Sequence, residues 1–422
     1  MILLQAGPSR EQFRRPGGYL SQVRALPRAL PRALSNVVGP LLAAVALITA
    51  GYLYLRFGSG NLPRLASPDM RAHVDFDSFL RSAVALRNHT DLYRTGSTLP
   101  NLDPPVLAVL LAPLAGLDAL TAYRAFALLN AVLAVGSVII MADRAKVRPA
   151  WAMIAVAAVA VSSPLQGTVA LGQVYGLLAA ALTVAWLARR HGRLGWAGVA
   201  LGLAVALKPS LLPLLLWPLL RRDRPTLFAA LGTGAVATAV GIVAGGWTAT
   251  VEWLRLLGAF QVTGFGDNAS LAALAVRFHL PSWLGCLAGG VLLGITLWRA
   301  PRRPEHAIWS ITAAALLLAP VAWNNYLVLL APSVPVLLGL RQWRPAVALL
   351  ALPVIGIEWV LLLPAGDSIL TRLGMSLYCG VLLTYWAVLT FAPVPAEPET
   401  DSAEWAAELD SWLGPPRERA HS

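Results

Sequence analysis

The sequence is short of cysteine, of lysine and of charge in general. Of its 422 residues 13% are charged, whereas about a quarter of the residues in an average soluble domain are. The two cysteines, Cys286 and Cys379, both lie in apolar runs, which excludes a disulfide framework and a CxxC metal site. The first 35 residues are basic and have no early apolar core, so we expect no cleavable signal peptide.

Apolar residues take the place of the missing charge. Hydrophobic types make up 57% of the chain, and the mean hydropathy is +0.65. These values are typical of a polytopic membrane protein, whose partner is the lipid bilayer. The formal charge of +12 comes from arginines in short clusters between apolar runs rather than in one patch. That distribution indicates membrane topology and excludes nucleic acid as a partner.

Apolar runs bounded by charge or proline divide the chain into three parts. A basic arm at 1–37 precedes a transmembrane domain at 38–392, and an acidic tail follows at 393–422. We expect an all-α domain with about 10–13 transmembrane helices. The short, proline-broken run at 104–117 is expected to be re-entrant or interfacial. The predicted spans lie near 38–56, 122–142, 149–165, 171–188, 194–207, 210–220, 225–246, 283–298, 306–322, 326–340, 345–363 and 372–392.

Charge in the short loops predicts the orientation of these spans. Basic residues resist translocation and therefore mark cytoplasmic loops. Counting from a cytoplasmic N-terminus, the inner loops are all basic, and both termini are predicted to be cytoplasmic. The expected location of the protein is the plasma membrane. The loop at 57–103 then lies outside. The inner loops read "DRAKVR" at 143–148, "RRHGR" at 189–193, "RRDR" at 221–224, "RAPRRPE" at 299–305 and "RQWR" at 341–344.

The first outer loop contains "HVDFDSFLRSAVALRNHTDLYR" at 73–94, where two aspartates stand two residues apart. The apolar spacing predicts an amphipathic helix from Phe76 to Leu86, lying on the outer leaflet. On a helix Asp75 and Asp77 are about 200° apart, so they do not form a chelating D-x-D pair. The alternative interpretation is that both acids cap the start of this helix.

Two further stretches place polar residues at the ends of predicted outer helices. "QGTVALGQVYGLL" at 166–178 has Gln173 and Tyr175 among glycines, which also suits plain helix packing. "LGLAVALKPS" at 201–210 ends in Lys208, one of only two lysines. A compact ammonium in an arginine-rich chain favours phosphate binding, although a lysine reaching the lipid headgroups would look the same.

Six blocks in this order resemble glycosyltransferase family 87. The resemblance covers about 65–335, and its blocks are specific in combination rather than singly. In this sequence they read "VDFDSFLRSAVALRNHTDLY", "LPNLDPPVLAVLLAPLAGLD", "LGQVYGLL", "GLAVALKPS", "DNASLAALAVRF" and "LAPVAWNNYLVLLAP".

The resemblance implies a glycosyltransferase of the GT-C type with an active site on the outer face. Its donor is a polyprenyl-phosphate sugar, either mannose or arabinofuranose, and its acceptor is a glycolipid or lipoglycan. The residues support this donor class, because the chain has no Gly-rich nucleotide-binding motif. We expect no cofactor and no bound metal, since the stretch offers one free carboxylate and no histidine cluster.

The resemblance also implies roles for single residues. Asp75 is the general base that activates the acceptor hydroxyl, and displacement from the opposite face inverts the anomeric centre. Lys208, then Arg277 and Arg81, stabilise the leaving phosphate, and Trp323 stacks on a sugar ring. The other residues expected to bind sugar or acceptor are Asp77, Gln173, Tyr175, Asn268, Ser270, Asn324 and Asn325.

One segment departs from the family pattern. Where the family usually has a histidine after Trp323, this chain has Asn324, Asn325 and Tyr326, and an amide donates a weaker hydrogen bond than a charged imidazole. His73 and His279, both expected outside, are possible substitutes.

Two other functions stay open at this point: a transporter or flippase, which would need charges near the bilayer midplane, and an inactive scaffold in envelope assembly.

Overall fold

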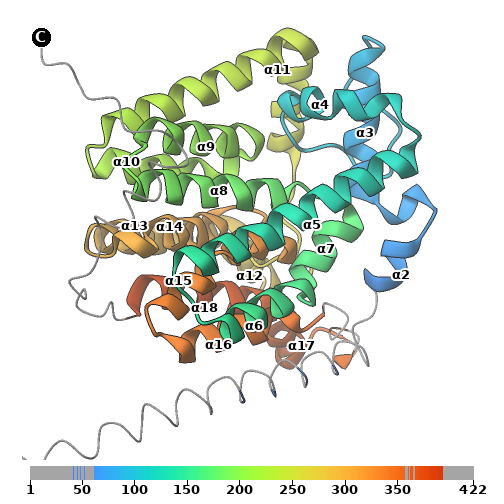
Figure 1. Cartoon of the computed structure of the whole chain (residues 1–422). Coiled ribbons are helices and arrows are strands. Elements are labelled where there is room, and N and C mark those ends of the chain that lie inside the picture. Colours follow the sequence, from blue (N-terminus) through green and yellow to red (C-terminus); the bar gives the residue numbers. More distant parts are fainter. Residues whose placement is uncertain are drawn as a thin grey trace, which may run out of the picture.

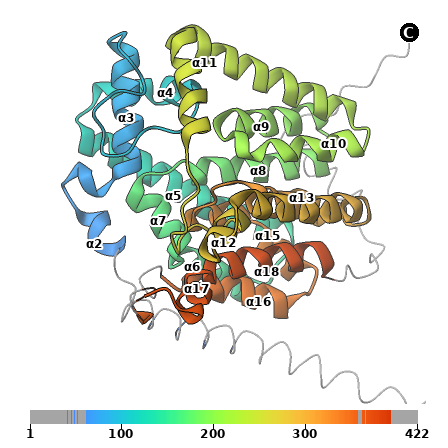
Figure 2. The ribbon, with the colours of Figure 1, turned by 180° about the vertical axis from the view of Figure 1, so that it is seen from behind.

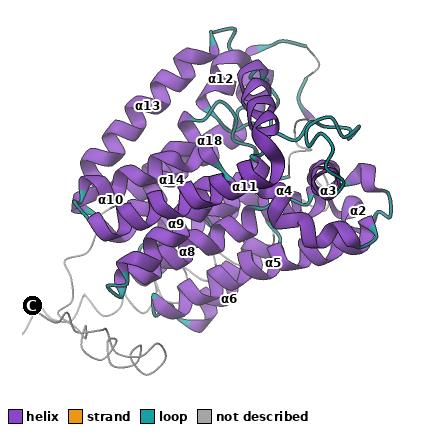
Figure 3. Ribbon diagram, turned by 90° about the horizontal axis from the view of Figure 1, so that it is seen from above, coloured by secondary structure: helices purple, strands orange, loops and turns teal. Residues whose placement is uncertain are grey.

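The computed structural model of the chain describes residues 61–356, 360, 362–364 and 366–392, with isolated positions at 41, 45, 48 and 52. Among these residues the regular structure is helical, and strand pairing is limited to an isolated bridge between Asn268 and Trp323 (Figure 3). The all-α prediction is therefore confirmed. Apart from the isolated positions, the predicted arm at 1–37, the first span at 38–56 and the tail at 393–422 lie outside the described residues.

The helices follow one another with short connections, and the 3-10 helices among them are labelled η. The first half contains α2 Asn61–Ala66, η1 Met70–Ala72, α3 Val74–Arg87, α4 Pro105–Leu111, η2 Ala112–Gly116, α5 Ala119–Arg144, α6 Pro149–Ala160, α7 Ser163–Leu171, α8 Tyr175–Arg190 and α9 Leu194–Leu207. The second half contains η3 Pro209–Leu215, α10 Leu216–Leu220, α11 Arg224–Ala259, α12 Leu271–Arg277, α13 Ser282–Arg299, η4 Ala300–Arg302, α14 Pro304–Leu318, η5 Asn324–Leu330, α15 Ser333–Gly339, α16 Trp343–Ala351, η6 Leu352–Val354, α17 Ile369–Met375 and α18 Leu377–Phe391.

Three described helices are long and apolar enough to cross a bilayer, namely α5, α11 and α13 with its extension through η4. The pairs α6 with α7 and α17 with α18, bent by 47° and 52°, raise the number to five if each pair is one span. The other predicted spans within the described residues appear as shorter helices, such as α9 at 194–207. Hydropathy locates apolar runs, but a proline such as Pro213 inside a run interrupts the helix.

The helices pack in a bundle (Figures 1 and 2), and α14 lies in its interior. On one side α8, α9 and α11 pack against one another, while α13 and α18 pack directly on α14. Residues 306–317 of α14 are buried without exception, which makes this helix the centre of the core. Helices α3 and α4 lie at one end of the bundle, where α4 contacts α11 and α3 contacts α4.

The direction of the helices separates two ends of the bundle. Helix α8 begins at Tyr175, and α14 ends at Leu318. The helix η5 that follows α14 contacts α8 and α7, and α7 contacts α3, so these helix ends lie toward α3. At the other end of the same helices, Arg190 of α8 forms an ion pair with Glu305 of α14 at 3.0 Å. The basic residue Arg190 and the start of α14 therefore lie at the end of these two helices that is remote from Tyr175 and Leu318.

Candidate active site

The amphipathic helix predicted in the first outer loop is α3. Its apolar face packs against α4, η2 and α5 of the same protein, so the prediction of the helix is confirmed while its apolar face is covered by protein. Val84, an apolar residue within the predicted spacing from Phe76 to Leu86, is 38% exposed and does not belong to this face. The buried apolar residues of α3 include Phe76, Phe79, Leu80 and Ala83.

Asp75 lies in the first turn of α3, and the side chain of Gln173 hydrogen-bonds to its carboxylate. Gln173 comes directly after Gly172, which ends α7 with a φ of +74°. A β-carbon at Gly172 would lie 2.4 Å from the β-carbon of Phe76, so only glycine permits this approach of the turn to α3. The sequence "LGQ" thus brings the amide of Gln173 to Asp75.

Asp75 stands in a group of charged side chains. The side chain is partly exposed, yet the surrounding protein removes enough water that burial raises the pKa of Asp75 to about 6. The hydrogen bond from Gln173 opposes this shift by lowering the pKa, and the charge of Lys208 does the same. The carboxylates of Asp103 and Asp267 raise it further. A carboxyl with a pKa in this range accepts protons near neutral pH more readily than an ordinary aspartate.

Lys208 and Asp103 form a buried ion pair close to Asp75. The ammonium of Lys208 donates to Oδ1 of Asp103 at 2.8 Å, and the side chains are 15% and 6% exposed. Asp103 is held in turn by Asn101, whose side-chain oxygen accepts from the Asp103 amide at 2.9 Å. Because Lys208 directly follows α9, it is presented at the end of a well-packed helix.

Two tyrosine rings enclose the ammonium of Lys208. Its nitrogen lies 5.7 Å from the ring centroid of Tyr175 and 5.2 Å from that of Tyr326, within the range of cation–π attraction. The two rings contact each other with centroids 4.4 Å apart. Tyr175 begins α8 right after the Gln173 turn, so the "GQVY" stretch supplies groups to both Asp75 and Lys208.

Asp77 faces a different partner from Asp75. Both carboxylate oxygens of Asp77 accept from Nε of Arg81 at 2.9 Å, one turn along α3. The helix begins after His73, whose side chain makes no capping hydrogen bond, and among the described residues neither aspartate is seen to accept from a free amide of this turn. Both aspartates do lie in the first turn, as the capping interpretation expected, where their charge suits the helix dipole. The predicted separation of the two carboxylates is confirmed by their different partners. Arg81 remains half exposed and engaged with Asp77.

Asn268 and Ser270 connect two chain segments. The side-chain oxygen of Asn268 accepts from the amides of Ser270 at 3.2 Å and of Ala322 at 3.1 Å. The hydroxyl of Ser270 donates to the carbonyl of Pro320 and caps α12. These bonds fix the residues next to Trp323, which bridges to Asn268. Their contacts in the structure are therefore internal, and sugar binding by these side chains stays a prediction.

Arg277 braces the same loop. Its guanidinium donates to the carbonyls of Gly264 at 3.1 Å, of Phe265 at 2.6 Å and of Asn268. It also reaches the hydroxyl of Ser376 at 3.4 Å. These bonds hold the loop that carries Asp267, whereas phosphate binding by Arg277 stays a prediction.

The segment with the family departure is buried. Asn324 donates to the hydroxyl of Ser163 at 3.2 Å, and the side-chain oxygen of Asn325 is buried with no hydrogen-bond partner among the described residues. The next residue, Tyr326, is the one that reaches Lys208. Of the three residues that stand in place of the family's histidine, Tyr326 thus contacts the lysine.

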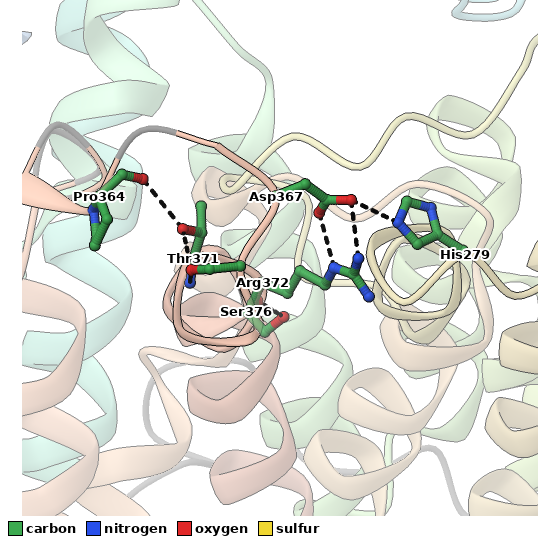
Figure 4. A network of polar contacts seen from close by, with 7 residues as sticks. His279, Pro364, Asp367, Thr371, Arg372 and Ser376 are labelled. Atoms are coloured by element: carbon green, nitrogen blue, oxygen red, sulfur yellow. Dashed lines mark hydrogen bonds and ion pairs between the residues drawn. The ribbon is translucent and has the colours of Figure 1, made fainter.

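The two histidines considered as substitutes are both engaged elsewhere. His73 is fully buried, with its ring 3.5 Å from that of Tyr123 and Nδ1 2.6 Å from the carbonyl oxygen of Ala170. His279 is exposed and lies 2.7 Å from Oδ2 of Asp367, which also binds Arg372 (Figure 4). Among the described residues no group of three or more His, Cys, Asp or Glu side chains is placed to hold a metal ion.

Comparison with known families decides the class of the protein. The profile of glycosyltransferase family 87 matches residues 101–323, which is more than half of the chain. The chain belongs to glycosyltransferase family 87. This family 87 chain is accordingly a multi-pass membrane glycosyltransferase, and the predicted GT-C-type helical class is confirmed. The transporter and inactive-scaffold alternatives give way to this assignment.

Named relatives of the family 87 chain carry two kinds of activity. It is 31% identical over 355 residues to a polyprenol-phosphate-mannose-dependent alpha-(1-2)-phosphatidylinositol mannoside mannosyltransferase of Mycobacterium tuberculosis, covering 74% of this chain and 78% of that protein. It is 28% identical over 271 residues to an alpha-(1->3)-arabinofuranosyltransferase of Corynebacterium glutamicum, covering 60% and 61%. The solved structure of ArnT from Cupriavidus metallidurans bound to undecaprenyl phosphate matches with a TM-score of 0.40 at 15% identity, over 84% of this chain and 78% of that one.

Sequence reasoning on this family 87 chain selected Asp75, Gln173, Tyr175 and Lys208, which the structure brings together. It missed Asp103. The residue stands in the block "LPNLDPPVL", where an acid just before an apolar run was the available signal. Asp267 in "DNASL" and Tyr326 after Asn325 likewise had no predicted role.

Proposed function

We propose that the chain transfers a mannosyl group from polyprenyl-phosphomannose to a lipid-linked glycan or lipoglycan on the outer face of the plasma membrane. The observation that carries this proposal is the placement of a protein-enclosed carboxyl, Asp75, beside the ammonium of Lys208. A base and a cation at one site are what attack by a hydroxyl and departure of a phosphate require. Cytoplasmic termini, and the arm, transmembrane domain and tail at 1–37, 38–392 and 393–422, belong to the same proposal.

In the proposed reaction Asp75 accepts the proton of an acceptor hydroxyl as its oxygen attacks the anomeric carbon. The bond between that carbon and the phosphate oxygen breaks, and the polyprenyl phosphate leaves with the electron pair. Attack and departure on opposite faces invert the anomeric centre. Lys208 stabilises the charge that grows on the leaving phosphate, because a preorganised cation in a water-poor site acts strongly.

Other residues are proposed to hold the substrates around these two groups. Gln173 orients the Asp75 carboxylate, and Tyr175 limits the position of Lys208. Trp323 offers a ring for stacking on a sugar, and its backbone is fixed by Asn268. Further proposed contacts to sugar, acceptor or phosphate come from Asp77, Arg81, Ser270, Arg277, Asn324 and Asn325.

The choice of sugar is tested by supplying each donor to membranes that contain the chain. Similarity to mannosyltransferases over 74% of the chain supports the mannose donor, and similarity to an arabinofuranosyltransferase supports a second candidate. We expect label from radiolabelled polyprenyl-phosphomannose to enter lipid-extractable glycans, with background levels in Asp75→Asn membranes. Transfer from the arabinose donor alone would establish the second candidate, and transfer from neither donor would contradict the proposal.

The proposed base predicts a pH profile. Only the carboxylate form of Asp75 accepts a proton, and burial raises its pKa to about 6. The value of kcat/KM should therefore be level above pH 6 and fall about tenfold per pH unit below it. Gln173→Leu should shift the inflection to higher pH. The hydrogen bond from Gln173 lowers the pKa of Asp75 in the wild type, so its removal raises that pKa. A profile without an inflection near pH 6, or one unmoved by Gln173→Leu, would rule out Asp75 as the titrating base.

A further inference from the structure

A group of basic side chains lies at the end of the bundle remote from Asp75, in the turn from α13 to α14. Arg299 is the last residue of α13, and Arg303 is the N-cap residue directly before Pro304, the first residue of α14. His306 follows one turn into α14, and its amide bonds to the carbonyl of Arg303 at 3.1 Å. We call Arg299, Arg303 and His306 the turn cluster.

The turn cluster has buried polar atoms that nothing in the described part of the chain satisfies. Nε of Arg299, Nη1 of Arg303 and both ring nitrogens of His306 are shielded from solvent and have no hydrogen-bond partner. Buried donors in folded proteins almost always have an acceptor. Both guanidinium groups only donate, and a neutral imidazole donates from one of its two ring nitrogens. The missing partner is therefore an acceptor, and one with negative charge suits the cluster best.

The three side chains act on one another as neighbours. The charge of Arg303 interacts electrostatically with the ring of His306, and the charge of Arg299 interacts in the same way with the guanidinium of Arg303. The 15-residue helix α14 begins with proline and has no side-chain cap, so its first turn adds a partial positive charge at the same place. Two guanidinium groups and a helix start held this close repel one another unless an anion separates them.

Nearby acids face other residues. Oε2 of Glu305 accepts from Arg190 of α8 at 3.0 Å, and Asp223 binds Arg189 of the same helix. Both carboxylates therefore stabilise the neighbouring helix end. The four unsatisfied atoms of the turn cluster have no hydrogen-bond partner among the described residues.

The position of the turn cluster along the membrane normal fits a lipid headgroup. The apolar helix that ends at Arg302 is long enough to span the bilayer, so its end reaches the headgroup level. Trp298, one residue before Arg299, is 64% exposed, as interfacial tryptophans are. The guanidinium of Arg302 lies 5.2 Å from its ring on the outside of this turn. Lipid phosphate is thus available at the height of the unpaired donors.

We propose that Arg299, Arg303 and His306 form a binding site for the phosphate of an anionic glycerophospholipid. The site is separate from the Asp75 group and takes no part in sugar transfer. Its occupant bridges the end of α13 and the start of α14, so binding holds the two helices together. A lipid that binds only the folded protein raises its thermal stability in proportion to the logarithm of its concentration.

The test uses the purified full-length protein in micelles of detergent and phosphatidylcholine, titrated with phosphatidylglycerol. Bound lipid is counted by native mass spectrometry, and the unfolding temperature is measured in parallel. We expect retention of phosphatidylglycerol and a dose-dependent rise in unfolding temperature. Arg299→Gln and Arg303→Gln should each weaken the apparent affinity about tenfold or more, the loss of a charged hydrogen bond.

Arg302→Gln is the matched control. Arg302 lies in the same turn, but it is exposed and its guanidinium donates to the carbonyl of Trp298. We expect less than about a twofold change in affinity, as for a surface charge. Circular dichroism confirms the fold of each variant, and Arg299→Gln stands in if Arg303→Gln does not fold. Equal retention of phosphatidylcholine, or equal loss in Arg302→Gln, would overturn the proposal. Equal stabilisation by inorganic phosphate would assign the site to free phosphate instead.

Discussion

Asp75→Asn is expected to lower the rate of sugar transfer by about 10²–10⁴-fold, the range that a positioned general base supplies. The substitution keeps the shape of the side chain and replaces the proton acceptor by an amide. It also removes the negative charge next to Lys208, so donor binding should not weaken. We therefore expect the loss in kcat, with KM for the donor changed little. Initial rates with radiolabelled polyprenyl-phosphomannose over a range of donor concentrations measure both quantities.

Asp77→Asn provides the matched control for this prediction. Asp77 lies on the same helix two residues away, but its carboxylate pairs with Arg81 rather than with Gln173. Since Arg81 is half exposed, loss of this pair should cost little stability, about 1 kcal/mol or less. We expect its transfer rate to stay within about fivefold of wild type. A larger loss in Asp77→Asn than in Asp75→Asn would reverse the assignment of the base.

The asymmetry between these two aspartates was accessible from the sequence. Apolar spacing from Phe76 to Leu86 predicts a helix, and a helix turns residues two apart away from each other. The structure confirms the helix as α3 and gives the two carboxylates different partners. Local periodicity was sufficient here, because the property in question depends on neighbours within one turn.

The partner of Lys208 was not accessible in the same way. Asp103 is separated from it by 105 residues, and the pairing depends on how α4 packs on α9 and α11. No periodicity in the sequence records such a contact. The same holds for Arg277, which reads as a free cation in an outer loop. Its donors are instead taken by three backbone carbonyls of the residues before it, and a loop path cannot be deduced from residue types.

The end of one span was located by hydropathy, but the reason for its bend was not. Residues 225–246 were expected to form one span, and the first straight part of α11 does end at the non-helical Gly246, after which the helix resumes and continues to Ala259. Glycine tolerates the φ of 83° found there, which a hydropathy scale does not consider. After this bend the indole of Trp253 donates to the carbonyl of Leu102 at 3.0 Å, next to Asp103.

Lys208→Met is expected to lower transfer by about 10²–10³-fold, since it removes the cation proposed to stabilise the leaving phosphate. The substitution has a second effect, because it leaves the carboxylate of Asp103 buried and unpaired. Loss of one partner from a buried ion pair costs about 3–5 kcal/mol of stability. A loss of activity in this variant alone would therefore not separate a catalytic role from a structural one.

The double variant Lys208→Met with Asp103→Asn separates the two roles. It removes both charges of the buried pair, so we expect the unfolding temperature to return most of the way to wild type. Transfer should stay low, because the cation is still missing. In Lys208→Met the inflection of the pH profile should also move upward, since Lys208 lowers the pKa of Asp75. If the double variant recovered both transfer and stability, the role of Lys208 would be structural. The proposal that Lys208 stabilises the departing phosphate would then be wrong.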